Sequence, residues 1–328
     1  MLSNAANQAL DSKTKQRILH IPKKDLVLKD LKRNRWLYMF LVPGILFIFV
    51  FKYFPIIWNI IAFQDYNIAD GISGIFTGKW VGFKHFKYLF FETYDFWQVF
   101  RNMALIALYR IVWGFPAPII LALLLNEVRR MWFKKLAQTI AYLPYFISWV
   151  VVAGMVQLIL SPSEGAVNEL IKMLGGEPVA FMQRKEWFRT ILVSITIYKE
   201  IGYGTIIYLA ALAGINSEQY ESAVIDGAKR LQTIRYITIP GILPTMIVVL
   251  ILQVGSILRG GFEQVLLLYS PVVYEVADII PTYVYRTGIQ MGRFSYSAAV
   301  GLFESVLAVS MILVTNKLAG KYGKGGLW

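Results

Sequence analysis

Of the charged residues inside long apolar stretches, three are placed where they could bind a ligand or form ion pairs. Arg110 lies within the stretch Asn102–Asn126, and Lys199 and Glu200 lie near the middle of Phe188–Ala213. A charge at the centre of a membrane-spanning helix costs at least about 2.5 kcal/mol, so these groups must face protein or water. They either line a pathway or brace neighbouring helices. Neighbouring helical positions point about 100° apart, so Lys199 and Glu200 cannot both face one cavity.

Residues suited to catalysis or metal binding are scarce. The chain has no cysteine, which excludes disulfides, thiol nucleophiles and thiolate metal sites. Its two histidines, His20 and His85, are far apart in sequence, and we find no constellation of paired acids, of metal ligands or of a nucleophile with its base. It also lacks the Gly-x-x-x-x-Gly-Lys-Ser/Thr loop that cradles phosphates. We therefore predict no catalytic residue, no metal site and no cofactor bound by this chain.

The composition is that of a membrane protein. Of the 328 residues, 57% are hydrophobic and 16% charged, and mean hydropathy is +0.54. Lipid offers no hydrogen-bond partners to the backbone, so apolar stretches of about 20 residues must be helices. We therefore expect an all-α membrane protein.

Six apolar stretches are long enough to cross a membrane. They predict about six transmembrane helices, at Trp36–Ile60, Asn102–Asn126, Ala137–Leu160, Phe188–Ala213, Ile242–Leu258 and Ala298–Leu318. The first follows some 35 polar residues without a small-residue cleavage site, so we interpret it as a retained helix.

Basic residues orient these helices. The formal charge is +13, and basic residues cluster in residues 1–35, in the loop Glu127–Leu136 and at Lys229, Arg230 and Arg235 within Gly214–Gly241. By the positive-inside rule these segments are cytoplasmic, which predicts N-in, C-in topology in the cell inner membrane and explains the charge without nucleic acid. Residues 1–35 are then a basic cytoplasmic tail with an interfacial segment, and residues 36–328 form the transmembrane domain. We find no internal repeat, so one chain is expected to supply half of a pore.

The segment 214–241 has the pattern of an amphipathic helix followed by a bend. Asn216 is suited to cap the helix, with Gln219 at capping-box spacing. An apolar stripe is predicted along one face, and Gly227 is expected to weaken the helix where the chain bends. The residues of this stripe are Tyr220, Ala223, Val224, Ala228 and Leu231.

This segment resembles the EAA motif of ABC importer permeases. Glu221-Ser222-Ala223 stands for Glu-Ala-Ala, Gly227 follows four positions later, and the motif closes at Ile237 and Pro240. Ser222 and Ile239 depart from the family pattern, both with little change in size. In that family the segment docks on an ATPase subunit. The resemblance implies an ATPase-coupling set of Tyr220, Glu221, Ser222, Ala223, Asp226, Gly227, Ala228 and Arg230.

Further stretches resemble the permeases of complex-oligosaccharide importers, including those for alginate and pectin-derived oligosaccharides. They are residues 62–66, 80–83, 142–149, 206–212 and 282–286. The resemblance implies a type I permease fold and import of oligosaccharides, with uronate-containing ones as one class. Candidate pathway residues are the charged residues Arg110, Lys199 and Glu200 inside the apolar stretches, together with Tyr208, because a tyrosine ring can stack on a sugar.

The same resemblance implies the partners. They are a second permease subunit, two ATPase subunits that hold ATP and Mg, an extracytoplasmic solute-binding protein, the oligosaccharide and membrane lipid. The alternatives are a stand-alone channel or ion-coupled transporter, and a membrane-embedded enzyme such as a glycosyl transferase. A transport assay distinguishes the first alternative from an ABC permease, because an ABC permease without its own phosphate-binding loop transports only with an ATPase subunit and ATP. The second alternative needs a catalytic constellation, which the sequence lacks.

Overall fold

The computed structural model describes residues 30–257 and 261–322, and contacts divide the chain into units 1–60 and 61–328. Most of the predicted basic tail, up to residue 29, lies outside the described residues, as does His20.

A continuous helical segment from Arg35 to Phe63 begins in the first unit. Its parts are α3 (Arg35–Ile48), the π-helix η1 (Phe49–Tyr53), α4 (Phe54–Ile57) and the 3-10 helix η2 (Trp58–Phe63). None of the residues of α3 is buried within its own unit. An apolar helix without a covered face needs apolar surroundings, as a membrane provides.

The second unit starts with a small two-stranded antiparallel sheet and short helices. These are β1 (Gln64–Asp65), η3 (Ile68–Ser73), α5 (Gly74–Thr77), β2 (Lys79–Trp80), α6 (Lys84–Lys87) and η4 (Tyr88–Glu92). Gln64 pairs with Trp80, and Asp65 pairs with Lys79.

Longer helices follow. The first group is α7 (Tyr94–Tyr109), η5 (Arg110–Gly114), α8 (Pro116–Asn126), α9 (Met131–Tyr142), η6 (Leu143–Phe146), α10 (Trp149–Ile159), α11 (Ala166–Met173), η7 (Phe181–Gln183) and α12 (Lys185–Ala213). The second group is α13 (Ser217–Ile225), α14 (Arg230–Thr233), η8 (Ile234–Thr238), α15 (Ile239–Ile257), α16 (Phe262–Leu268), η9 (Pro271–Val273), α17 (Tyr274–Ala277), α18 (Ile280–Tyr285), η10 (Arg286–Gln290) and α19 (Phe294–Tyr322).

Four of the six predicted spans lie in helices long and apolar enough to cross a membrane. These helices are Arg35–Phe63, Tyr94–Asn126, Arg230–Ser256 and Phe294–Lys317. The third predicted span is broken, because Met131–Phe146 and Trp149–Ile159 meet at 99°. The fourth lies in α12, which at 29 residues is about 43 Å long. The number of six spans and the N-in, C-in topology stay predictions.

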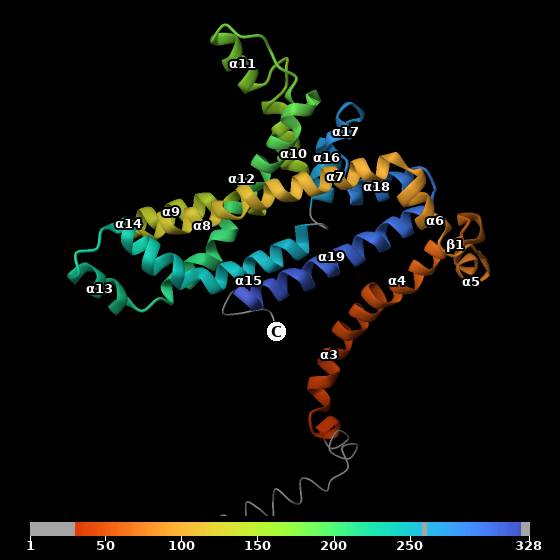
Figure 1. Ribbon diagram of the computed structural model, residues 1–328, viewed down its shortest axis with the longest axis horizontal. Helices are drawn as coiled ribbons and strands as arrows, with labels where there is room; N and C mark the ends of the chain where they lie inside the picture. Colours follow the sequence, from red (N-terminus) through yellow and green to blue (C-terminus); the bar gives the residue numbers. More distant parts are fainter. Residues whose placement is uncertain (1–29, 258–260, 323–328) are drawn as a thin grey trace, which may run out of the picture. The chain divides into compact units, whose positions relative to one another are not determined.

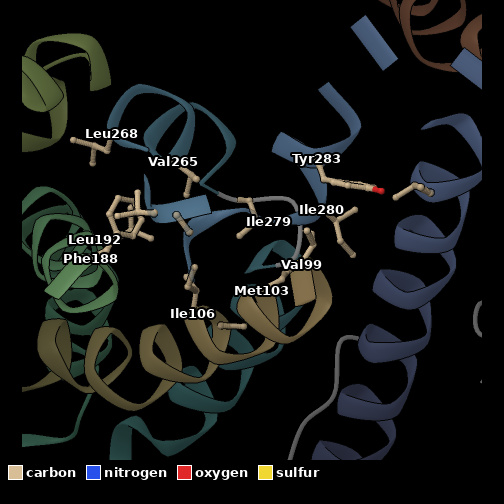
Figure 2. Packing of buried hydrophobic residues seen from close by; sticks show 14 of the residues in the cluster. Val99, Met103, Ile106, Phe188, Leu192, Val265, Leu268, Ile279, Ile280 and Tyr283 are labelled. Atoms are coloured by element: carbon tan, nitrogen blue, oxygen red, sulfur yellow. The ribbon is translucent and has the colours of Figure 1, made fainter. Parts of the chain in front are cut away.

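The main core of the second unit joins helices that are far apart in sequence. Figure 2 shows Val99, Met103 and Ile106 of α7 facing apolar side chains of α12, α16, α18 and the residue that precedes α18. The labelled partners are Phe188, Leu192, Val265, Leu268, Ile279, Ile280 and Tyr283. The helical stretch that contains Arg110 is therefore fixed against the helix that contains Lys199.

Two ends of the unit can be told apart from the course of the chain. The helix α12 ends at Ala213, just before α13, and α15 leads away from α14 (Figure 1). The beginning of α12 therefore lies at the opposite end from α13, and Lys185 there pairs with Glu275 of α17. We call these the α13 end and the α17 end.

Candidate functional site

The segment at the α13 end begins with the predicted helix cap. The side chain of Asn216 accepts a hydrogen bond from the amide of Glu218 at 3.0 Å. This satisfies one of the amides that a helix leaves free in its first turn. In a capping box, the Gln219 side chain would accept from the amide of Asn216. Here it is the backbone amide of Gln219 that donates, to the backbone carbonyl of Asn216 at 3.2 Å.

The helix ends at Ile225, earlier than the sequence indicates. Gly227 has φ +72°, its amide donates to the carbonyl of Val224 at 3.1 Å, and the amide of Ala228 donates to that of Ala223 at 2.9 Å. This is the Schellman arrangement, in which a left-handed glycine terminates a helix. A single helix over 216–231 is therefore wrong, whereas the bend at Gly227 is confirmed. Another helical segment starts at Arg230.

The predicted apolar stripe is left largely uncovered. Val224, Ile225 and Leu231 are 72%, 85% and 79% exposed. The motif residues Glu221, Ser222, Asp226, Gly227 and Arg230 are also exposed, and Tyr220, Ala223 and Ala228 are half-buried. A mixed apolar and charged surface of this kind is typical of a protein interaction site.

Side-chain contacts connect this surface to the long helices. The hydroxyl of Tyr220 lies 3.2 Å from that of Thr238 in η8, which continues into α15. Arg230 pairs with Glu127, the residue directly after α8, at 3.5 Å. Force applied at α13 can therefore reach two helices of the bundle.

Lys199 lies at the break between α9 and α10. Its ammonium group donates to the carbonyl oxygens of Tyr145 at 2.7 Å, Ile147 at 2.5 Å and Pro144 at 3.4 Å. A helix C-terminus leaves carbonyls without partners and attracts positive charge. These contacts favour the brace over the pathway interpretation, and direct contact with a substrate stays a prediction.

A close backbone approach accompanies this brace. A Cβ atom on Gly202 would lie 2.0 Å from the carbonyl oxygen of Ala141. Only glycine permits that separation, because real Cβ contacts are never so short. The broken segment is thus seated directly on α12.

An exposed aromatic pair lies beside the break. The rings of Tyr145 and Tyr203 are stacked with centroids 4.0 Å apart and planes at 6°. The ammonium of Lys199 lies 5.5 Å from the centroid of the Tyr145 ring. Tyr145 is 36% exposed and Tyr203 is 46% exposed. Flat π-surfaces with hydroxyl groups at their edges suit the faces of sugar rings.

Arg110 belongs to a separate polar cluster. One nitrogen of its guanidinium, Nη2, donates to Oε1 of Gln264 at 2.7 Å, and the same oxygen accepts from Thr196 at 3.1 Å. Gln264 is fully buried and donates to the carbonyl of Leu192 at 2.8 Å. Among the described residues, Nε of Arg110 has no hydrogen-bond partner. Arg110 thus braces α16 while keeping unused donor capacity.

The other two candidates occupy different surroundings. Glu200 is exposed within its unit, although it directly follows buried Lys199. Tyr208 is only 1% exposed and packs among Ile119, Ala122 and Ile242. Its hydroxyl has no hydrogen-bond partner in the described part of the chain. Arg110 and Lys199 lie within electrostatic range of Glu200, whereas Tyr208 lies in an apolar cluster, and the pathway role of the four stays a prediction.

At the α17 end, sequence analysis missed a buried polar clamp. Asn102 donates to the carbonyls of Glu275 and Asp278, and Arg189 donates to Asn102 Oδ1 at 2.8 Å. The carboxylate of Asp278 is bound by Arg286 and by Thr282, the latter at 2.6 Å. Burial raises the pKa of Asp278, and these two groups oppose the rise. The available signal was a pair of polar residues at the starts of predicted apolar stretches, Asn102 and Arg189.

One family model matches residues 114–322 of the chain. It describes a binding-protein-dependent transport system inner membrane component. Two relatives come from Bacillus subtilis (strain 168). Protein LplB is 45% identical, with 91% of this chain and 92% of that protein covered. The polygalacturonan/rhamnogalacturonan transport system permease protein YteP is 43% identical, with 93% and 94% covered.

A solved structure is also similar. It is the crystal structure of a bacterial alginate ABC transporter in complex with alginate pentasaccharide-bound periplasmic protein. The matched chain has a TM-score of 0.83 and 42% identity, covering 91% of this chain and 99% of that one.

Proposed function

Since the chain belongs to the binding-protein-dependent transport system inner membrane components, we propose that it forms half of a pore through which oligosaccharides enter the cytoplasm. It is a multi-pass inner-membrane permease subunit of an ABC importer, with the type I permease fold, and it is not an enzyme. ATP hydrolysis in a partner subunit drives transport in this family.

The observation that carries the coupling assignment is the uncovered surface of α13. Val224 and Ile225 are exposed beside Glu221, and the Schellman turn at Gly227 gives the surface a fixed end. Such a surface needs a partner to cover its apolar atoms. The eight residues of the predicted ATPase-coupling set lie here, which supports docking of an ATPase subunit at this end.

The pathway assignment rests on the tyrosine pair and on the cluster at Arg110. Tyr145 and Tyr203 offer a stacking surface, and Arg110 has donor capacity that Gln264 does not use. Lys199 contributes by holding the break, because three carbonyls occupy its ammonium. An acidic substrate therefore gains no electrostatic support from Lys199. Glu200 and Tyr208 complete the proposed pathway set.

An oligosaccharide substrate is supported by the relatives. YteP is named for polygalacturonan and rhamnogalacturonan transport, and the solved relative belongs to an alginate transporter. We extend the substrate class to this chain as an oligosaccharide.

The partners follow from the architecture of half a pore. A second permease completes the pore, two ATPase subunits carry ATP and Mg, and a solute-binding protein delivers the oligosaccharide. The alginate transporter was solved with such a periplasmic protein. This chain itself holds no cofactor in the proposal.

The test is ATP-driven uptake in proteoliposomes. The chain is reconstituted with the second permease and the ATPases, and a radiolabelled oligosaccharide is supplied with the binding protein. We expect uptake only with all subunits and enclosed ATP. Uptake by this chain alone would contradict the assignment and favour a stand-alone transporter. Full uptake by its homodimer with the ATPases would refute the need for a second permease.

A further inference from the structure

A cavity of about 480 Å³ lies at the end of the second unit where α19 begins. Its walls come from two segments far apart in sequence, Asp65–Ile68 with His85, and Gly292–Tyr296. The amide of Tyr66 donates to the hydroxyl of Ser295 at 2.9 Å, which joins the two segments. The cavity is therefore a built feature of the fold.

The cavity lies away from the α13 surface. The helix α15 leads away from α14, and the segment that follows α15 contacts the beginning of α12 through Glu275 and Lys185. The clamp at the α17 end connects this region to α18, whose Tyr283 donates to or accepts from Tyr296 at 2.9 Å. The cavity is thus opposite the proposed ATPase surface, on the face where substrate arrives under the proposed function.

Arg293 supplies a positive charge to this cavity. Its guanidinium carbon lies 5.2 Å from the ring centroid of Tyr88 and 5.0 Å from that of Tyr296. Both distances are in the range of cation–π interactions, which hold the group in place without neutralising it. In the described segments, the polar groups that act on the exposed Arg293 side chain are the hydroxyls of Tyr88, Tyr296 and Tyr283. The group is therefore available to an anion from outside.

Asp65, the acid of the cavity lining, is already neutralised. Its carboxylate accepts from Lys84 at 2.7 Å and lies 3.3 Å from Nε2 of His85. The hydrogen bond from Lys84 lowers the pKa of Asp65. The remaining charge of the lining is thus that of Arg293.

Aromatic rings stand next to this charge. Tyr66 and Phe294 form an edge-to-face pair with centroids 6.3 Å apart, and both line the cavity with Arg293. A guanidinium binds a carboxylate through paired hydrogen bonds, and aromatic rings pack on the faces of sugars. One uronic acid residue carries both features on a single ring.

From this arrangement we propose that the cavity is a surface subsite for a uronate residue of the incoming oligosaccharide, with Arg293 binding its carboxylate. The subsite rests on the proposed import of oligosaccharides and adds an acidic substrate class. In this proposal, the preference for acidic oligosaccharides comes from Arg293 at the surface and not from Lys199.

The test measures binding to the assembled importer in nanodiscs, without the binding protein. The probes are trigalacturonate and its methyl ester, which has the same rings without the charges. Saturation-transfer NMR reports contact and affinity. We expect wild type to prefer the acid and Arg293→Gln to lose about tenfold affinity for the acid with little change for the ester, because a charge-assisted hydrogen bond is lost.

Two further variants separate charge from structure. Arg293→Lys keeps the charge and should retain the preference. Asn67→Asp adds a negative charge to the lining, and aspartate can still accept the hydrogen bond from Ala69 that Asn67 accepts at 3.0 Å. It should weaken binding of the acid alone. Lys87→Gln removes an exposed charge outside the lining and should behave as wild type.

Equal affinity of wild type and Arg293→Gln for trigalacturonate would overturn the subsite. So would an Arg293→Gln importer that binds the acid normally but loses docking of the binding protein, because the cavity would then hold a protein carboxylate. If the wild-type complex imports no oligosaccharide in proteoliposomes, the proposed function fails. If ATP-driven import is normal but Arg293→Gln does not change the affinity for the acid, only the subsite proposal is refuted and the proposed function stands.

Discussion

The segment at α13 and the break between α9 and α10 handle unpaired helix ends in opposite ways. At α13 the free backbone groups are satisfied by residues within a few positions, through the Asn216 cap and the turn at Gly227. At the break, the carbonyls of Tyr145 and Ile147 are satisfied by Lys199, more than 50 positions away. The first solution is local and the second is tertiary.

We therefore expect substitutions in the two regions to have different effects, on function at α13 and on stability at the break. The α13 segment exposes its apolar side chains, so a change there can alter the proposed ATPase docking while the bundle stays intact. The break is held on α12 by one ammonium group, that of Lys199, and by one glycine, Gly202. Changes there should affect stability first.

The largest effect is expected at Gly202. In Gly202→Ala, the new Cβ would lie 2.0 Å from the carbonyl oxygen of Ala141, so the two backbones must separate. We expect destabilisation of about 3 kcal/mol or more, seen as a lower melting temperature and loss of folded yield in nanodiscs. The control is Gly154→Ala in α10, which meets nothing within 4 Å and should be neutral or slightly stabilising. Equal behaviour of the two variants would contradict the close approach.

Gly227→Trp should produce a large functional loss without unfolding. The site is open, with nothing within 4 Å, but φ is +72° and the surface is the proposed ATPase contact. We expect transport and substrate-stimulated ATPase activity to fall at least tenfold with the bundle intact. Gly227→Asn tolerates the left-handed conformation better and should keep activity. Wild-type coupling in the tryptophan variant would refute docking at this turn.

Lys199→Met should have an intermediate effect on stability. The variant leaves carbonyls unpaired, at about 1–3 kcal/mol each, and removes a charge whose insertion costs about 2.5–3.5 kcal/mol. These partly cancel, so we expect net destabilisation of about 2 kcal/mol in thermal unfolding. Uptake of neutral and uronate oligosaccharides should fall equally. Selective loss of the uronate would show that Lys199 contacts substrate, and Tyr198→Leu, at an exposed neighbour, is the control.

The smallest effect is expected for the exposed pair of Lys185 and Glu275. The hydrogen bond from Lys185 lowers the pKa of Glu275 in the folded protein. A lowered folded pKa adds stability above the unfolded value of about 4.3, and this is lost as pH falls through the folded pKa. Glu275→Gln should therefore lower thermal stability slightly at pH 7, and the difference from wild type should shrink as the pH falls below the unfolded value. A large loss at pH 7 would mean that the pair, and not the Asn102 clamp, holds α17.

The sequence by itself determined the class, the apolar helices and the cap and turn of the α13 segment. Runs of some 20 apolar residues must become helices in lipid, and the cap at Asn216 and the turn at Gly227 depend on neighbours in sequence. The length of a helix also depends on its end, and the Schellman turn placed that end at Ile225.

Only the tertiary structure decided what the buried charges contact. Nothing near Lys199 in sequence indicates the carbonyls of a broken helix, and nothing near Arg110 indicates Gln264. The cavity at Arg293 joins segments more than 200 positions apart. A buried or uncompensated charge is defined by the groups that the fold brings around it, and hydrophobic periodicity carries no information on those partners.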